Sequence, residues 1–339
     1  MNERELTGSP SIDKPWQQYY SEAALHAPLP GGSMYDYMAA CNADRLEKTA
    51  LNYFGRKFSY RELICEISRA AAAFCKIGIH SGTVVMAFAL NTPECIVSIY
   101  ALNRLGAIVD LQYADQSPRE ALENLQLTQA RFILTADTFL PLVQDTLELG
   151  NFGTSVQVIT IPAARSLPPL KRLFFPTPRR SIRADNILNF DDILVDLYDP
   201  IPPGKADAPA LIVHTSGTTG VPKGVLLSNK NVNAVAVEYK NSLLELKPGD
   251  SILNIAPPFV AFGICLAIHT PLCLGMQVCL SPSPDPETNG KTFFFYKPVH
   301  FLGGPAHVRS IVQMHKRQSL SFVRTIGYGG EAISSENAK

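Results

Sequence analysis

The segment with the clearest capacity for chemistry covers residues 211–225 and reads Leu-Ile-Val-His-Thr-Ser-Gly-Thr-Thr-Gly-Val-Pro-Lys-Gly-Val. An apolar run, typical of a buried strand, leads into a cluster of hydroxyl and glycine residues followed by a lysine. Glycines let the backbone approach a ligand closely, while hydroxyl groups and free amides supply hydrogen-bond donors. A lysine adds a point charge that suits polyphosphate oxygens. The predicted phosphate-binding loop holds Thr215, Ser216, Gly217, Thr218, Thr219, Gly220 and Lys223.

This loop differs from the Walker phosphate-binding loop. In the Walker pattern a second glycine stands directly before the lysine, and a serine or threonine follows the lysine. Counted from Gly217, those two positions hold Pro222 and Gly224. The alternative without function is a glycine- and threonine-rich turn with an exposed lysine. Seven such residues in one cluster after an apolar strand favour the phosphate-binding interpretation.

Strands and helices must alternate to position this loop. Ser59 and Glu62 form a capping box at one helix start, and Ser117 with Glu120 repeats the signal. Apolar runs at 84–90, 108–111, 132–134 and 156–161 are typical of buried strands, and further strands are expected near Leu211, Ile252, Val278, Phe301 and Val323. Alternation at this spacing predicts an α/β fold with two lobes of doubly wound, mainly parallel sheets and helices on both faces.

The same alternation suggests a domain organisation. Residues 1–33 are expected to be an irregular lead-in, 34–161 a first α/β lobe, 162–207 a surface linker and 208–339 a second α/β lobe that carries the loop. The linker is rich in proline and arginine, and its arginines are expected to be solvated.

Composition excludes several classes of protein. Thirty basic residues balance thirty acidic ones, which argues against nucleic acid as a partner. Seven cysteines without a CxxC pair indicate neither a disulfide framework nor a zinc site, and no metal site is predicted from the histidines.

Residues 251–284 lack Asp, Glu, Lys and Arg, but prolines interrupt the run, so we predict interior structure and no membrane span. A cytoplasmic location is expected, since the N-terminus does not resemble a signal peptide.

Residues 215–224 resemble the signature loop of the adenylate-forming superfamily, which includes acyl-CoA synthetases, peptide-synthetase adenylation domains and luciferases. The match is unbroken over ten residues. Four other segments, at 58–63, 103–107, 301–306 and 329–334, are also similar to segments of that superfamily. The resemblance covers residues 49–339 and is closest to the N-terminal part of an acyl-CoA synthetase.

The resemblance implies a two-step reaction. A carboxylate would attack the α-phosphorus of ATP, bound with Mg²⁺, to give acyl-AMP and pyrophosphate, and CoA would then accept the acyl group. The residues implied to hold the β- and γ-phosphates are Thr215, Ser216, Gly217, Thr218, Thr219 and Lys223. Those implied to contact adenine and ribose are Gly330, Glu331 and Ala332. The catalytic lysine of the superfamily lies in a smaller C-terminal domain, so we expect residues 1–339 to be an N-terminal part without it.

The segment 256–263, Ala-Pro-Pro-Phe-Val-Ala-Phe-Gly, corresponds to a family segment near the acyl group. Val260 stands where a histidine is common, and where peptide-synthetase domains often place an aspartate that pairs with an amino group. Valine cannot form that pair, so an apolar acyl or aryl chain is favoured. The predicted acyl pocket consists of Phe259, Val260, Phe262, Gly263 and Gly303. For any single one of these residues, a role in the core is an equally good interpretation.

Two alternatives to an acyl-CoA synthetase stay open. One is an adenylation domain that loads a carrier protein, which would use the same nucleotide and small-molecule acid. The other, of a different class, is a nucleotide-binding or interaction module that retains the fold without catalysis. His214 and His307 lack partners at metal-ligand or triad spacing, so we expect structural roles for both.

Overall fold

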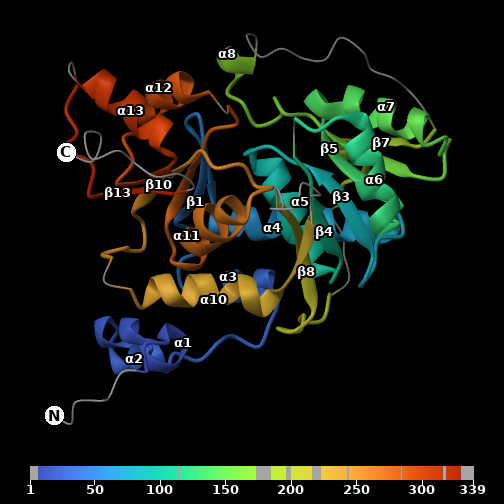
Figure 1. The fold of residues 1–339 in the computed structure, drawn as a ribbon. Helices are drawn as coiled ribbons and strands as arrows, with labels where there is room; N and C mark the ends of the chain where they lie inside the picture. Colours follow the sequence, from blue (N-terminus) through green and yellow to red (C-terminus); the bar gives the residue numbers. More distant parts are fainter. Residues whose placement is uncertain are drawn as a thin grey trace.

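The computed structural model describes residues 7–113, 115–172, 185–195, 200–215, 223–242, 244–283, 285–315 and 318–329. Within them, strands alternate with helices and form two sheets (Figure 1). The first sheet has seven strands in the order β7-β6-β5-β3-β4-β8-β9. Its strands are β3 (Val84–Phe88), β4 (Ile108–Leu111), β5 (Phe132–Ala136), β6 (Gln157–Ile161), β7 (Ile187–Asn189), β8 (Pro209–Thr215) and β9 (Lys223–Ser228).

The second sheet has six strands in the order β13-β12-β10-β11-β1-β2. Its strands are β1 (Thr49–Tyr53), β2 (Arg56–Ser59), β10 (Ser251–Asn254), β11 (Gln277–Leu280), β12 (His300–Gly303) and β13 (Thr325–Tyr328). Neighbouring strands are parallel in both sheets except for the pairs β1–β2 and β8–β9. The prediction of two mainly parallel sheets is confirmed, whereas the two antiparallel edge pairs were missed.

Helix starts follow the capping signals of the sequence. Ser59 caps α4 (Tyr60–Lys76) and Ser117 caps α6 (Pro118–Thr128), each in a complete capping box with the predicted glutamate. Thr92 caps α5 (Pro93–Arg104). The remaining longer helices are α3 (Met34–Cys41), α7 (Leu140–Leu149), α10 (Asn229–Lys240), α12 (Pro286–Tyr296), α13 (Pro305–His315) and the π-helix η3 (Phe262–His269). Shorter helical segments are α1 (Pro10–Asp13), η1 (Pro15–Tyr19), α2 (Glu22–Leu25), η2 (Asp137–Phe139), α8 (Pro169–Arg172), α9 (Phe190–Ile193) and α11 (Thr270–Cys273).

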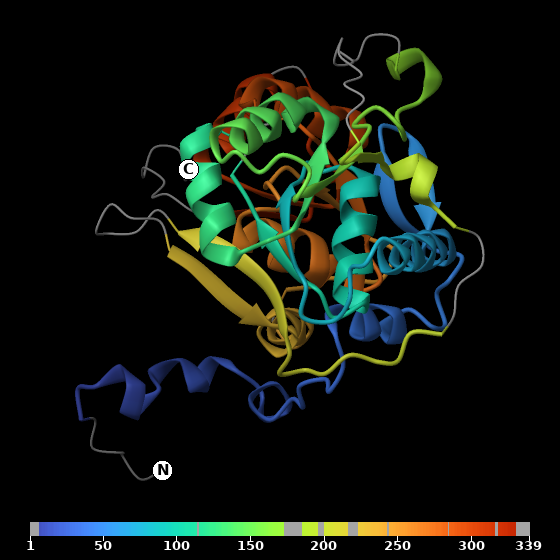
Figure 2. The ribbon, with the colours of Figure 1, turned by 90° about the vertical axis from the view of Figure 1, so that its right-hand side faces the viewer.

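Three apolar cores hold the layers together. The largest lies between the sheets, where α4 contacts β1 and β2 while α5 contacts α4 and β4. A second core joins α6 and α7 to the outer face of the seven-stranded sheet. A third joins α12 and α13 to the outer face of the six-stranded sheet (Figures 1 and 2). Helices therefore cover both faces of each sheet, as the alternation predicts.

The two sheets do not divide the chain where the predicted lobes do. β1 and β2 lie within 34–161 but join the six-stranded sheet, since β1 pairs with β11. β8 and β9 lie within 208–339 but join the seven-stranded sheet, since β8 pairs with β4. Each sheet thus takes strands from both sides of residues 162–207, because sequence alternation does not reveal which distant strands pair. The division into domains stays a proposal.

The first described residues form an arm that extends away from the body of the molecule (Figure 2). It contains α1, η1 and α2, where the sequence suggested irregular structure, and exposes Trp16, Tyr19 and Tyr20. Residues 251–280, in the uncharged region, are interior elements: β10, η3, α11 and β11. In the part of the chain that the structure describes, no helix has both the length and the apolar character that crossing a bilayer requires.

Candidate active site

The strand that leads to the predicted phosphate-binding loop is β8. Leu211 is fully buried and Val213 is nearly so, which confirms the predicted buried strand. Thr215, its last residue, is exposed and pairs with Lys223, the first residue of β9. Lys223 therefore begins a strand, where the sequence suggested a loop position. Ser216, Gly217, Thr218 and Thr219 lie outside the described residues, so their phosphate-binding role stays a prediction.

His214 fixes the end of β8 in the sheet. Its buried Nε2 lies 2.7 Å from Oδ1 of Asp110 on β4 and 3.0 Å from the side-chain nitrogen of Gln112. Burial raises the pKa of Asp110, and the hydrogen bond from His214 opposes that increase. Asp110 and Gln112 are thus the partners of His214 in its expected structural role, and the contact joins the carboxyl ends of β4 and β8.

Tyr113 connects the end of β8 to the segment 256–263, which contains most of the predicted acyl-pocket residues. The sequence patterns did not single out Tyr113. Its hydroxyl donates a hydrogen bond of 2.8 Å to the carbonyl oxygen of His214. Its ring lies against Phe259, with the ring centroids 5.0 Å apart. A signal was present, since Tyr113 follows the strand Ile108–Leu111, and ligands bind at the carboxyl ends of parallel strands.

Two buried asparagines hold the acyl segment against the seven-stranded sheet. The side chain of Asn91, just after β3, donates to the carbonyl oxygen of Ala256 at 2.9 Å. Asn254, at the end of β10, donates to Asn91 Oδ1 at 3.1 Å. These bonds join the carboxyl ends of the two sheets and fix where the segment after β10 begins.

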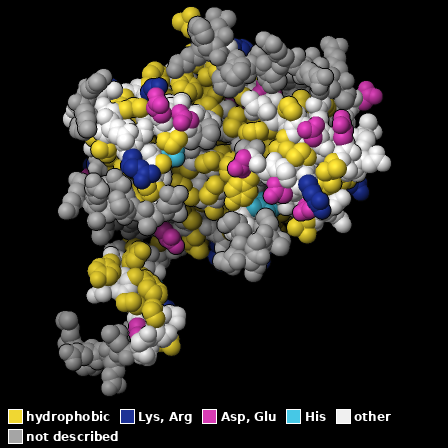
Figure 3. All heavy atoms as spheres, turned by 45° about the horizontal axis from the view of Figure 1, so that its top comes forward, with side chains coloured by type: hydrophobic (Ala, Val, Ile, Leu, Met, Phe, Trp, Pro, Cys, Tyr) yellow, Lys and Arg dark blue, Asp and Glu magenta, His cyan; other side chains and the backbone are white. Residues whose placement is uncertain are grey.

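A cavity of about 370 Å³ lies between the carboxyl ends of the two sheets. It is mostly apolar and is lined by Ala89, Leu90, Asn91, Thr138, Phe139, Ile255, Pro257, Pro258, Phe259, Ser281, Pro282 and Ser283. Figure 3 shows hydrophobic side chains gathered across the middle of the upper face of the molecule. Among the predicted acyl-pocket residues, Phe259 lines this cavity.

The other predicted acyl-pocket residues lie at the start of η3 and at the end of β12. Val260 and Phe262 are half-buried, and Gly263 is buried. Gly303 ends β12, where a side-chain carbon would lie 2.9 Å from Ile255 Cδ1. Gly329 donates a hydrogen bond of 3.2 Å to the Gly303 carbonyl oxygen, so the predicted adenine-binding segment begins beside Gly303. Gly330, Glu331 and Ala332 themselves lie outside the described residues.

No group of three or more His, Cys, Asp and Glu side chains among the described residues could hold a metal ion. The described side chains therefore provide no protein ligand set for the Mg²⁺ that the sequence resemblance implies.

Known proteins resemble this chain in sequence. A long-chain-fatty-acid–CoA ligase of Bacillus subtilis is 25% identical over 337 residues, which cover 95% of this chain and 60% of that enzyme. An acetyl-coenzyme A synthetase of Coprinopsis cinerea is 26% identical over 310 residues, covering 86% of this chain and 46% of that enzyme. The chain thus spans between about half and 60% of the length of these two relatives.

Solved structures share the fold. The anthranilate CoA ligase AuaEII, in complex with anthranoyl-AMP, matches with a TM-score of 0.76 at 22% identity, over 91% of this chain and 57% of that one. The N-terminal domain of FACL13 from Mycobacterium tuberculosis matches with a TM-score of 0.71 at 18% identity, over 90% of this chain and 72% of that one. The family model described as "AMP-binding enzyme" matches residues 38–339. Since that match spans most of the chain, this protein belongs to the AMP-binding enzyme family.

Proposed function

We propose that this chain provides the ATP-binding part of an enzyme that activates a hydrophobic carboxylic acid as its acyl-AMP and transfers the acyl group to CoA. One observation carries the proposal most directly. The end of β8, where the phosphate-binding segment begins, meets Phe259 through Tyr113, and Phe259 lines an apolar cavity of about 370 Å³. A nucleotide at β8 and an apolar acid at the cavity would therefore be neighbours, as a reaction between them requires.

The chemistry follows from that arrangement. A carboxylate oxygen of the acid forms a bond to the α-phosphorus of ATP, and the bond from that phosphorus to the β-phosphate bridging oxygen breaks. Pyrophosphate leaves with the electron pair. Thr215 and Lys223, which pair at the ends of β8 and β9, would bind the β- and γ-phosphates and stabilise the charge on the leaving group. The thiol of CoA then displaces AMP from the acyl carbon.

The relatives support the ligase chemistry, and their printed names differ in the acid. The Bacillus subtilis relative is a long-chain-fatty-acid ligase, and the Coprinopsis cinerea relative is an acetyl-coenzyme A synthetase. We favour a hydrophobic acid because Phe259 and the two prolines before it present apolar surface to the cavity. CoA is the proposed acceptor, and a carrier protein is the alternative.

Replacing Lys223 by alanine is expected to slow adenylation about tenfold, because the departing pyrophosphate loses a cationic partner. The side chain is exposed at the start of β9, so the free energy of unfolding should change by less than about 0.5 kcal/mol. Carboxylate-dependent exchange of pyrophosphate into ATP, measured in the whole enzyme, checks the rate. Lys230→Ala is the matched control, since Lys230 is an exposed lysine at the start of α10 that pairs only loosely with Asp207. Unfolding of Lys223→Ala with unchanged exchange would contradict the assignment.

Val260→Asp is expected to reduce activity on apolar acids, because the new carboxylate must lose water when such a chain binds beside it. ATP affinity and thermal stability should change much less, since Val260 is only half-buried. Val260→Thr, which keeps the branched shape and adds an uncharged hydroxyl group in place of the carboxylate, is the control. The measurement is kcat/KM for a series of fatty and aromatic acids. Equal values for both variants and the wild type across the series would place Val260 outside the pocket.

A further inference from the structure

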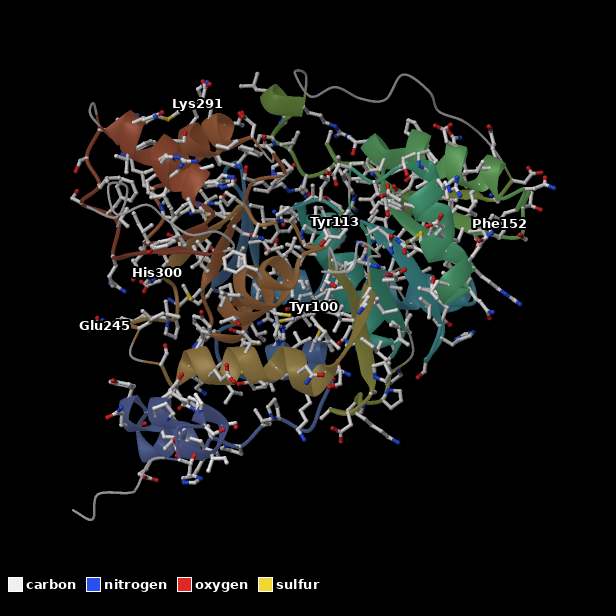
Figure 4. All side chains as sticks on the ribbon, in the orientation of Figure 1. Tyr100, Tyr113, Phe152, Glu245, Lys291 and His300 are labelled. Carbon is white, nitrogen blue, oxygen red and sulfur yellow. The ribbon has the colours of Figure 1, made fainter. Side chains whose placement is uncertain are left out.

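Tyr113 touches both parts of the candidate site from a third position in the chain. It lies near the centre of the molecule, between the two sheets (Figure 4). Its hydroxyl group bonds the His214 carbonyl oxygen at 2.8 Å, and its ring lies 5.0 Å from that of Phe259, inclined by 55°. The side chain is half-buried. One residue thus contacts the strand that leads to the phosphate-binding segment and the ring that lines the apolar cavity.

The contact at His214 bears directly on Thr215. The His214 carbonyl carbon is bonded to the amide nitrogen of Thr215, the first residue predicted to bind phosphate. The His214 ring is held by Asp110 and Gln112, so its side chain has little freedom to turn. The hydrogen bond from Tyr113 is then the side-chain contact that orients the peptide group leading into Thr215. The same peptide group lies at the end of the β8–β9 ladder, where His214 pairs with Gly224 and Thr215 with Lys223, so a shift of Tyr113 would act on the last pairs of this ladder.

The contact at Phe259 bears on the acid. Phe259 is half-buried and lines the cavity of about 370 Å³. Its ring position sets how far the Tyr113 ring can move, because two aromatic rings at this separation are in contact. A ligand that fills or reshapes the cavity and moves Phe259 would thus also affect the end of β8, because Tyr113 contacts both.

We propose that Tyr113 is a positioning residue that couples the acyl cavity to the nucleotide site. This inference rests on the proposed function, since it requires a nucleotide at the end of β8. Tyr113 acts through its hydroxyl on the His214–Thr215 peptide group and through its ring on Phe259. A change at Phe259 therefore alters nucleotide affinity only while the Tyr113 hydroxyl is present.

A double-mutant cycle on nucleotide affinity tests the coupling without knowledge of the natural acid. The four proteins are the wild type, Tyr113→Phe, Phe259→Leu and the double variant, each titrated calorimetrically with α,β-methylene-ATP and Mg²⁺. Tyr113→Phe keeps the ring and removes the hydroxyl, and we expect about fivefold weaker binding. Phe259→Leu alone should weaken binding about threefold. The double variant should bind about fivefold more weakly than the wild type, whereas independent effects would multiply to about fifteenfold.

The matched control is Tyr100→Phe. Tyr100 also loses a side-chain hydrogen bond, of 2.8 Å to His269, but it lies in the core among α5, η3 and α11 (Figure 4). That variant should melt at a lower temperature and bind the nucleotide as the wild type does. Tyr113→Phe should show the reverse pattern, which a merely structural role would not produce.

The outcomes separate this inference from the proposed function. If the wild type does not bind the nucleotide, the proposed function fails and the coupling fails with it. If the wild type binds and Tyr113→Phe binds equally well, or the two substitutions act independently, only the coupling is overturned.

Discussion

Replacing Gly263 by alanine is expected to lower the free energy of unfolding by about 3 kcal/mol, the upper end of what overpacking costs. Gly263 is the second residue of the π-helix η3 and is buried. A methyl group there would collide with the carbonyl oxygen of Pro257 and would lie 2.7 Å from its carbonyl carbon and 3.0 Å from the Ala256 oxygen. These are backbone atoms, and the hydrogen bond from Asn91 to the Ala256 carbonyl oxygen fixes the segment that contains them, so the chain cannot relax cheaply.

Gly303→Ala provides the comparison. A methyl group at Gly303 would lie 2.8 Å from Phe301 Cζ and 2.9 Å from Ile255 Cδ1, both at the ends of side chains that can shift slightly. We expect it to cost less than half as much as Gly263→Ala. Urea-induced unfolding of both variants, followed by circular dichroism, measures the difference. Equal costs, or a neutral Gly263→Ala, would show that the turn into η3 is packed differently.

Acidification is expected to destabilise the protein through His269. Burial lowers the pKa of this histidine from 6.5 to about 3, because its ring is fully enclosed and its polar partners lie on α10 and α5. Its Nε2 lies 2.9 Å from Asn233 Oδ1, and its Nδ1 lies 2.8 Å from the Tyr100 hydroxyl oxygen, so the neutral ring is bonded at both nitrogens. The unfolded chain takes up a proton below pH 6.5 while the folded chain does not. His269 therefore costs about 1.4 kcal/mol of stability for each pH unit below about 6, until the pH approaches its folded pKa.

His269→Gln isolates this contribution. Glutamine can accept a hydrogen bond from Tyr100 and donate one to Asn233, but it does not titrate. Burial raises the pKa of Glu94 and of Asp110, and these carboxyl groups stabilise the folded state as the pH falls. The difference between wild type and variant removes them from the comparison. Urea unfolding at pH 7.5, 6.0 and 4.5 should show the variant losing less stability than the wild type, and parallel losses would contradict the buried, neutral state of His269.

Local signals predicted the elements of this fold well. The capping boxes at Ser59 and Ser117 act within the first helical turn, and the strand at 108–111 has the predicted bounds. The strand expected near Val323 was placed less accurately, since β13 begins two residues later, at Thr325. The edge strand β9 was missed because glycine and lysine at its start are typical of a turn, and its pairing with β8 depends on the rest of the sheet.

The candidate site was only partly predictable for the same reason. A motif is contiguous, so the segments around Thr215 and Phe259 could be identified from the sequence alone. Their junction is not contiguous, because Tyr113, His214 and Phe259 come from three segments that meet only when both sheets have formed. The asparagine pair Asn91 and Asn254 is equally remote in sequence. Pairings of this kind depend on strand order, which alternation does not specify.

The most direct test of the account is equilibrium binding of ATP with Mg²⁺ to residues 1–339, measured calorimetrically for the wild type and for Lys223→Ala. We predict saturable binding at one site, weaker than in the longer relatives, because the chain spans only part of their length and closure of a second domain over a site strengthens binding. We predict a clear loss of affinity in the variant, because Lys223 would bind the phosphates. Failure to bind millimolar ATP, or equal binding by both proteins, would contradict the assignment of this chain as the nucleotide-binding part of an adenylate-forming ligase.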